Sequence, residues 1–121
     1  MWIYTQFGFF SAVKKKNTDF ITIRARVKKD LENLKVHYGA VMSDIVATKN
    51  TDYPYRAAMW PDKFVELVTK IAADVTYDNF KDRVMDTQGI AREEVYADVW
   101  LATRKLTQLE KEGISETKMF E

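Results

Sequence analysis

The stretch "FITIRARVKKDLENLKVHY", residues 20–38, changes its hydrophobic period halfway along and decides the class of fold. Over residues 20–27 apolar and polar side chains alternate, which is typical of a strand with one buried face. One predicted face carries Ile21, Ile23, Ala25 and Val27, and the other carries Thr22, Arg24 and Arg26. From Val27 onward apolar residues recur every three or four positions, which predicts a helix that ends at Gly39.

Strand patterns lie on both sides of this stretch. Residues 2–13 are rich in β-branched and aromatic types and predict one strand, with Gly8 as a candidate bulge. The polar residues 14–19 predict a turn that joins it to the strand over residues 20–27. A second hairpin is predicted from residues 44–49, 50–52 and 53–59.

Three more helices are predicted after the second hairpin. The first begins at Pro61, the second covers residues 77–86, and the third runs from Ala91 towards Lys111. We therefore expect one α+β domain over residues 1–112, with a four-stranded antiparallel sheet of two hairpins and helices on one face. The expected order is β-β-α-β-β-α-α-α, and residues 113–121 are expected to form a flexible tail.

The composition excludes several classes of function. The 121 residues carry 19 basic and 18 acidic side chains, and this balance argues against a protein that binds nucleic acid through a general basic excess. The chain has no cysteine, which excludes disulfides and thiolate chemistry. No targeting segment and no membrane span is predicted, so we expect a cytoplasmic protein without a cofactor.

The segment "DYPYR", residues 52–56, is the most informative short stretch for function. Pro54 has no amide hydrogen, so the segment is predicted to be an edge strand or to lie just before a strand. Whether the Tyr53–Pro54 bond is cis or trans stays open, with trans favoured. If Tyr55 packs in the core, Arg56 points outward together with Arg24 and Arg26.

Two interpretations of these arginines remain. They can be solvated or paired with acids such as Asp52 and Glu32, or they can form an anion site, because arginine binds phosphate and carboxylate through several donors and stacks on aromatic rings. With aromatic neighbours such as Trp2 or Tyr4, such a face can also bind single-stranded nucleic acid. The candidate site residues are Arg24, Arg26, Arg56, Tyr53 and Tyr55.

The other residues and motifs give weaker indications of function. His37 is the one histidine, and no residues near it in the sequence indicate a Ser-His-Asp arrangement. No metal-binding or phosphate-loop pattern is present. The segment "YDNFKDRV", residues 77–84, is interpreted mainly as a capped helix start. Its secondary binding candidates are Tyr77, Asn79 and Lys81.

Five segments together carry a resemblance: "MWIYTQFGFFS", "RARVKKDLENL", "TDYPYRA", "YDNFK" and "VYADVW". The chain resembles a family of small uncharacterised bacterial and phage-encoded proteins. That family has W-x-x-T-x-x-G-F-F-S, R-A-R-V, D-Y-P-Y-R and Y-x-N-F-K segments. The resemblance covers roughly residues 1–100. It implies no activity, because the family has none assigned.

We therefore expect a small binding or interaction module whose partner is another protein, as in a phage or bacterial accessory protein or inhibitor. The first alternative is binding of nucleic acid, nucleotide or another anion by Arg24, Arg26 and Arg56. The second is a small-substrate hydrolase of acyl-phosphate type.

Overall fold

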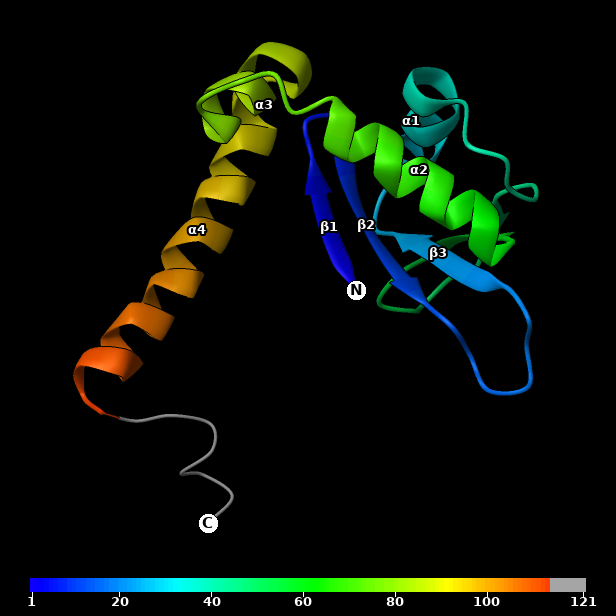
Figure 1. Cartoon of the computed structure of the whole chain (residues 1–121), viewed down its shortest axis with the longest axis horizontal. Helices are drawn as coiled ribbons and strands as arrows, with labels where there is room; N and C mark the ends of the chain where they lie inside the picture. Colours follow the sequence, from blue (N-terminus) through cyan, green and yellow to red (C-terminus); the bar gives the residue numbers. More distant parts are fainter. Residues whose placement is uncertain (114–121) are drawn as a thin grey trace. The chain divides into compact units, whose positions relative to one another are not determined.

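Five strands form one antiparallel sheet in the computed structural model, which describes residues 1–113 (Figure 1). The strand order is β1-β2-β3-β5-β4. An α+β fold with an antiparallel sheet and four helices was predicted and is confirmed, but the sheet was predicted with four strands. The strands are β1 (Trp2–Thr5), β2 (Gly8–Val13), β3 (Ile21–Ala25), β4 (Val46–Ala47) and β5 (Tyr55–Met59).

The additional strand comes from residues 2–13, which form the β1–β2 hairpin and not one bulged strand. Thr5 and Gly8 are paired, and the chain turns at Gln6 and Phe7. The Thr5 hydroxyl donates to the Gly8 carbonyl and accepts from the Phe7 amide. A buried threonine side chain thus holds a turn that contains none of the usual turn residues at its two central positions. The observed order is therefore β-β-β-α-β-β-α-α-α.

Strand β5 lies inside the sheet, between β3 and β4. Pro54 directly precedes it, as one of the two alternatives predicted, and its carbonyl accepts a hydrogen bond from the Thr48 amide at 2.7 Å. No cis peptide bond occurs among the described residues. The edge strand β4 is only two residues long, and Ser43 extends the pairing through its own amide and hydroxyl to Ala58. A short edge of this kind limits pairing with other chains.

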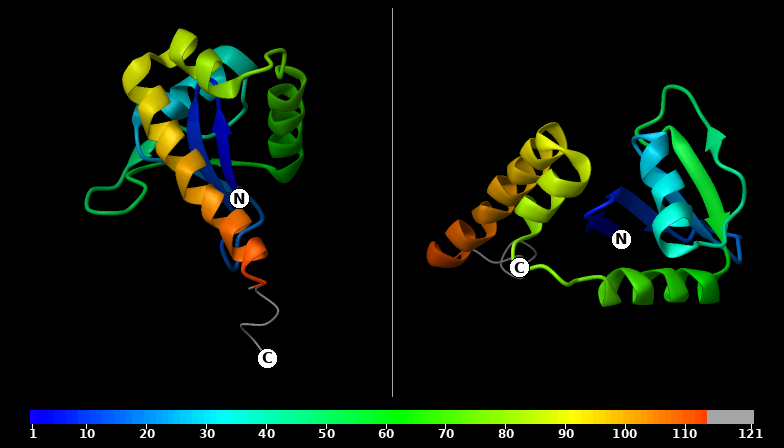
Figure 2. Two further views of the ribbon diagram at one scale, coloured as in Figure 1. Left: turned by 90° about the vertical axis from the view of Figure 1, so that its left-hand side faces the viewer. Right: turned by 90° about the horizontal axis from the view of Figure 1, so that it is seen from above.

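Two helices cover one face of the sheet. α1 (Lys28–Tyr38) contacts β2, β3, β5 and α2, and it ends as predicted at Gly39, which is left-handed. α2 (Pro61–Ala73) begins at Pro61 and buries Leu67. Figure 2 shows α1 against the strands from two further directions. The core between the helices and the sheet consists of Phe10, Ala12, Ile23, Ala25, Leu31, Leu34, Tyr38, Ala57, Met59 and Leu67.

The chain groups into two compact units, Met1–Phe80 and a second that begins at Lys81. The second unit contains most of α3 (Phe80–Gln88) and all of α4 (Ile90–Lys111). Val84 and Tyr96 are buried in these helices. Of the predicted tail, residues 114–121 lie outside the described part of the chain. No helix among the described residues is long and apolar enough to span a membrane.

Candidate anion-binding site

The register of the sheet places two of the predicted arginines directly opposite each other. Arg24 in β3 is the cross-strand partner of Arg56 in β5. On the neighbouring strand β2, the partner of Arg24 is Ser11. These residues share the face opposite the helices, because their neighbours Ile23 and Ala57 belong to the core. A single row therefore crosses all five strands: Trp2, Ser11, Arg24, Arg56 and Val46.

The ring of Tyr53 is the centre of the arginine cluster, which we define as Arg24, Arg26 and Arg56 around Tyr53. The guanidinium carbons of Arg24 and Arg26 lie 4.5 and 4.7 Å from the ring centroid. Tyr53 is buried, so its ring is desolvated by these contacts and its other neighbours. Cation–π attraction holds both guanidinium groups over the ring, and it is stronger for the half-buried Arg24 than for the exposed Arg26.

One hydrogen bond fixes the direction of each arginine. Arg24 Nη2 donates to Ser11 Oγ at 2.9 Å, and Arg26 Nη1 donates to the Asp52 carbonyl at 2.6 Å. Arg56 Nε donates to the Tyr53 carbonyl at 3.2 Å. Each bond uses one of the five N–H donors of its guanidinium. The acceptors are neutral oxygens, so these bonds position the three charges without neutralising them.

The interpretation that acids neutralise the arginines holds only in part. The Asp52 carboxylate is 4.0 Å from Arg56 Nη2, and its side chain is 64% exposed, so this ion pair contributes little. Glu32 lies on α1, which packs on the opposite face of the sheet. Arg24 Nε is buried and has no hydrogen-bond acceptor among the described residues. A guanidinium placed in this way costs folding free energy.

Aromatic rings continue the site along the same face. Tyr4 and Phe9 stack with their centroids 4.2 Å apart, and Phe9 lies 6.4 Å from Tyr53. Burial raises the pKa of Tyr4, the nearby Tyr53 raises it further, and the Arg26 charge opposes this rise. Trp2, in the same row as Arg24, is 69% exposed. The face thus combines cations with flat apolar surfaces.

The remaining predicted site residues do not join this cluster. Tyr55 points to the other face and packs against the core. Tyr77 and Asn79 lie in the connection between α2 and α3, where the Tyr77 ring is 5.8 Å from that of Phe80. Lys81 belongs to the second unit, and its ammonium nitrogen lies 4.6 Å from the centre of the Trp100 ring.

Two residues of the site were missed in the sequence. Ser11 anchors Arg24 and is fully buried, and Phe9 links Tyr4 to the ring of Tyr53. Both follow the alternation of β2, whose other face carries Phe10 and Ala12. A single polar residue on an apolar strand, as Ser11 is, was the available signal.

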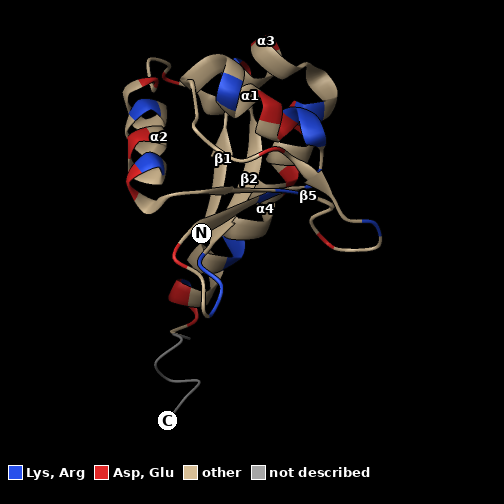
Figure 3. Ribbon diagram, turned by 90° about the vertical axis from the view of Figure 1, so that its right-hand side faces the viewer, with Lys and Arg blue, Asp and Glu red and all other residues tan. Residues whose placement is uncertain are grey.

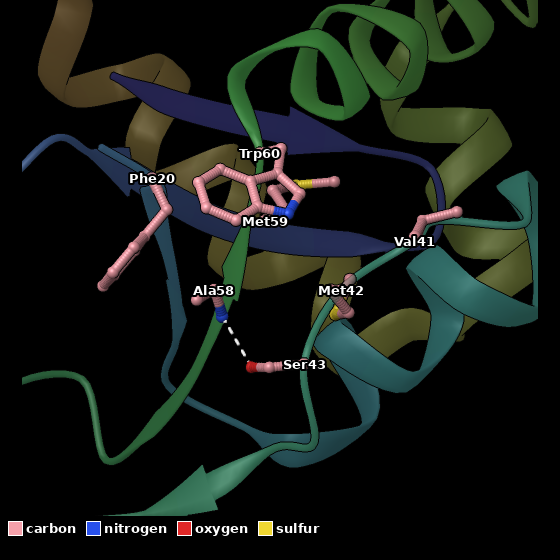
Figure 4. A pocket seen from close by; sticks show the side chains of 7 residues that line it. All are labelled: Phe20, Val41, Met42, Ser43, Ala58, Met59 and Trp60. Atoms are coloured by element: carbon pink, nitrogen blue, oxygen red, sulfur yellow. Dashed lines mark hydrogen bonds between the residues drawn. The ribbon is translucent and has the colours of Figure 1, made fainter. Parts of the chain in front are cut away.

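A second surface feature is an apolar pocket of about 330 Å³ beside the end of β5 (Figure 4). Trp60, which is 60% exposed, lies at this pocket. The polar side chain in the lining, Ser43, already bonds to the Ala58 amide and to the Asp44 carbonyl. The pocket therefore fits an apolar group. Its lining consists of Phe20, Val41, Met42, Ser43, Ala58, Met59 and Trp60.

A third feature lies where α1 and α2 meet the β1–β2 turn. One carboxylate oxygen of Asp74 accepts hydrogen bonds from Gln6 Nε2 and from the Tyr38 hydroxyl, at 2.7 and 2.8 Å. The ring of His37, which was not favoured as a catalytic base, stacks on the ring of Phe7 with the two centroids 3.6 Å apart. These contacts join α1, the end of α2 and the β1–β2 turn, so the residues that make them have a structural role.

Comparison of the chain with models of known families, with curated proteins and with solved structures finds no match. The resemblance to the bacterial and phage-encoded family therefore stays a prediction.

Proposed function

We propose that the arginine cluster binds phosphate groups of a single-stranded nucleic acid. The observation that carries the proposal is the placement of Arg24 directly opposite Arg56, with Arg24 and Arg26 both held over Tyr53. Like charges directly opposite each other destabilise a sheet. A bound anion removes this repulsion, because each guanidinium still has N–H donors that suit phosphate oxygens.

The aromatic residues supply the second half of the proposed interaction. Trp2 and Arg24 lie in one row, separated by β2, so their backbones are about 10 Å apart. A strand whose phosphate contacts Arg24 and Arg56 can therefore place a base on the exposed ring of Trp2. Stacking on an aromatic ring stabilises binding by about 1 to 3 kcal/mol per base and depends little on sequence.

The charge of the first unit agrees with a local site and not with a general basic surface. Residues 1–80 contain twelve basic and nine acidic side chains, a formal charge of +3. Both signs occur along α1 and α2 (Figure 3). We therefore expect binding that depends on a few phosphate contacts and has a shallow salt dependence.

Fluorescence anisotropy of a labelled 12-nucleotide oligo(dT), with a duplex of the same length for comparison, tests this proposal. Two or three phosphate contacts predict that affinity falls about 7- to 20-fold between 50 and 200 mM salt. The single strand should bind more tightly than the duplex, because only unpaired bases can stack.

Charge-matched variants identify the surface. Arg24→Glu with Arg56→Glu should abolish binding at 50 mM salt, whereas Lys29→Glu with Lys35→Glu on α1 changes the net charge equally and should bind within about threefold of wild type. Arg26→Glu is a second test variant that should also weaken binding. Arg26 is exposed, so its replacement leaves the core untouched. Equal loss in the α1 variant, or no binding by the wild-type protein, would contradict the proposal.

The apolar pocket favours a second candidate function, the protein-interaction module. Its volume of about 330 Å³ and the exposed Trp60 suit an apolar side chain of a partner protein. In nuclease-treated host lysate, a partner bound there should be retained by wild type and by the α1 double variant and lost with Trp60→Ala. Retention that is unchanged in Trp60→Ala would reject the pocket as the binding surface.

A further inference from the structure

Helix α4 carries a regular apolar stripe. Its apolar positions are spaced four, three, four and three residues apart, which is the spacing of a and d positions in a coiled coil. At about 100° per residue these positions stay within a narrow band of the helix surface. The stripe consists of Val95, Val99, Ala102, Leu106 and Leu109. Figure 1 shows α4 as one continuous helix along this whole length.

The stripe is largely uncovered. All residues from Trp100 to Gly113 are exposed, and Leu106 is 63% exposed. Most helical stability in proteins comes from packing of the apolar face against another element. An exposed stripe on a helix of 22 residues therefore indicates a partner for this face.

The neighbouring helix α3 uses a different side of α4. Lys81 of α3 lies over the ring of Trp100, and the buried Tyr96 is one turn before Trp100 on the same side. Tyr96 and Trp100 are displaced from Val95 by about 100° and 140° around the helix axis. The internal packing of the second unit thus leaves the stripe available.

The charges beside the stripe indicate what the partner is. With Val99 and Leu106 at a positions, Lys105 occupies a g position and Glu110 the following e position. In a parallel pair of identical helices, Lys105 of each copy faces Glu110 of the other. The residues three and four positions from either charge within α4 are uncharged, so α4 itself offers these two residues no local ion pair.

We propose that two copies of this chain associate through their α4 helices as a parallel, in-register coiled coil. This arrangement stacks all five apolar positions against their equivalents. An antiparallel pair that matches Leu109 with Val99 instead brings the two Lys105 side chains together. The proposal concerns the second unit and is independent of the anion site.

Sedimentation velocity over a range of about 5 to 500 µM protein tests the association. The stripe is short, so we expect a dissociation constant in the micromolar range rather than a permanent dimer. Leu106→Asp with Leu109→Asp should leave only monomer over this range. Leu101→Asp is the matched control, because Leu101 is 49% exposed but lies away from the stripe, and it should dimerise as wild type does.

Two experiments test the parallel register. Because the chain has no cysteine, Ala102→Cys introduces one thiol, which should form a disulfide with its equivalent under mild oxidation, while Leu101→Cys should not. Lys105→Glu and Glu110→Lys should each weaken the dimer several-fold, and the combined variant should restore it. A wild-type monomer at 500 µM, equal loss in Leu101→Asp, or failure of the combined variant to recover would overturn the proposal.

Discussion

Gly8 occupies a position in the first hairpin that no other residue can take without displacing its neighbours. Its φ is +151°, and a Cβ atom built there would lie 2.6 Å from Cγ of Asp30. The Asp30 carboxylate is buried and accepts a hydrogen bond from the Phe9 amide at 3.0 Å. Close approach of a buried acid, and not a bulge, thus explains the glycine.

Gly8→Ala should therefore lower the free energy of unfolding by about 3 kcal/mol, since it combines backbone strain with a clash in the core. Gly39→Ala is the matched control. Gly39 is also left-handed, but a Cβ there meets nothing closer than Lys70 Nζ at 3.9 Å, so the expected loss is about 1 kcal/mol. Urea unfolding followed by circular dichroism measures both. Equal losses would show that the contact with Asp30 is unimportant.

Arg24 illustrates the difference between a residue that stabilises the fold and one that serves binding. The variant Ser11→Ala with Arg24→Met removes the hydrogen-bonded pair together, so no buried hydroxyl is left unpaired. Its free energy of unfolding should stay within about 1 kcal/mol of the wild-type value, because the loss of the buried Nε and of the repulsion from Arg56 offsets the loss of the cation–π contact with Tyr53. Oligo(dT) affinity should fall about tenfold or more. A large loss of stability would show that the arginine is structural.

At the scale of elements, the Asp74 carboxylate joins the ends of α1 and α2 to the β1–β2 turn through Tyr38 and Gln6. Lys70 adds a hydrogen bond from α2 to the Tyr38 carbonyl at the end of α1, where a cation is favoured. Asn33 of α1 donates to the Phe7 carbonyl in the turn. These contacts fix the register between the first hairpin and both helices.

Tyr38 makes part of this connection dependent on pH. Burial raises the pKa of Tyr38 well above its usual value near 10, and the hydrogen bond to Asp74 raises it further. The folded protein therefore holds this proton more tightly than the unfolded chain does. The resulting stability is complete below about pH 10 and is lost as the pH rises from there towards the folded pKa.

Tyr38→Phe should accordingly cost about 1 to 2 kcal/mol at pH 7, where the hydroxyl donates to a carboxylate. The difference between wild type and Tyr38→Phe should shrink as the pH rises above 10, because only the wild-type protein loses the contribution of this proton. Urea unfolding of both proteins between pH 7 and 11 measures this difference. A difference that stays constant over this range would show that Tyr38 does not couple folding to pH.

At the scale of the whole molecule, the two proposals together predict a dependence on oligonucleotide length. A dimer carries two arginine clusters, so a strand long enough to reach both gains affinity through the second, intramolecular contact. The monomeric variant Leu106→Asp with Leu109→Asp should bind a 60-nucleotide oligo(dT) more tightly than a 12-mer only by the statistical factor that comes from the larger number of binding positions. Wild type should gain at least tenfold in affinity beyond that factor. Anisotropy titrations with both lengths compare the two proteins. The same gain in the monomeric variant would argue against bivalent binding.

The sequence alone determined the features that depend on local periodicity. The alternation within β3, the helix that follows it, the end of that helix at Gly39 and the start of α2 at Pro61 all appear as predicted, because near neighbours in the chain set the hydrophobic period and the helix ends. Val27 was predicted on the buried face but is 42% exposed, because β3 ends at Ala25 and Val27 is the N-cap of α1. That alternation placed Arg24 on the face opposite the core, and the alternation over residues 53–59 placed Arg56 there once Tyr55 packs against the core. A period of two fixes which side chains share a face once one of them is buried.

Only the tertiary structure decided how these elements combine. The turn at Gln6 and Phe7 is held by Thr5, Asn33 and Asp74, and two of these are far away in the sequence. The pairing of β5 with β3 made Arg56 the partner of Arg24, and the course of the chain before β5 brought Tyr53 between Arg24 and Arg26. Contacts between residues so far apart produce no periodic pattern in the sequence, because register and strand order follow from the packing of the whole core.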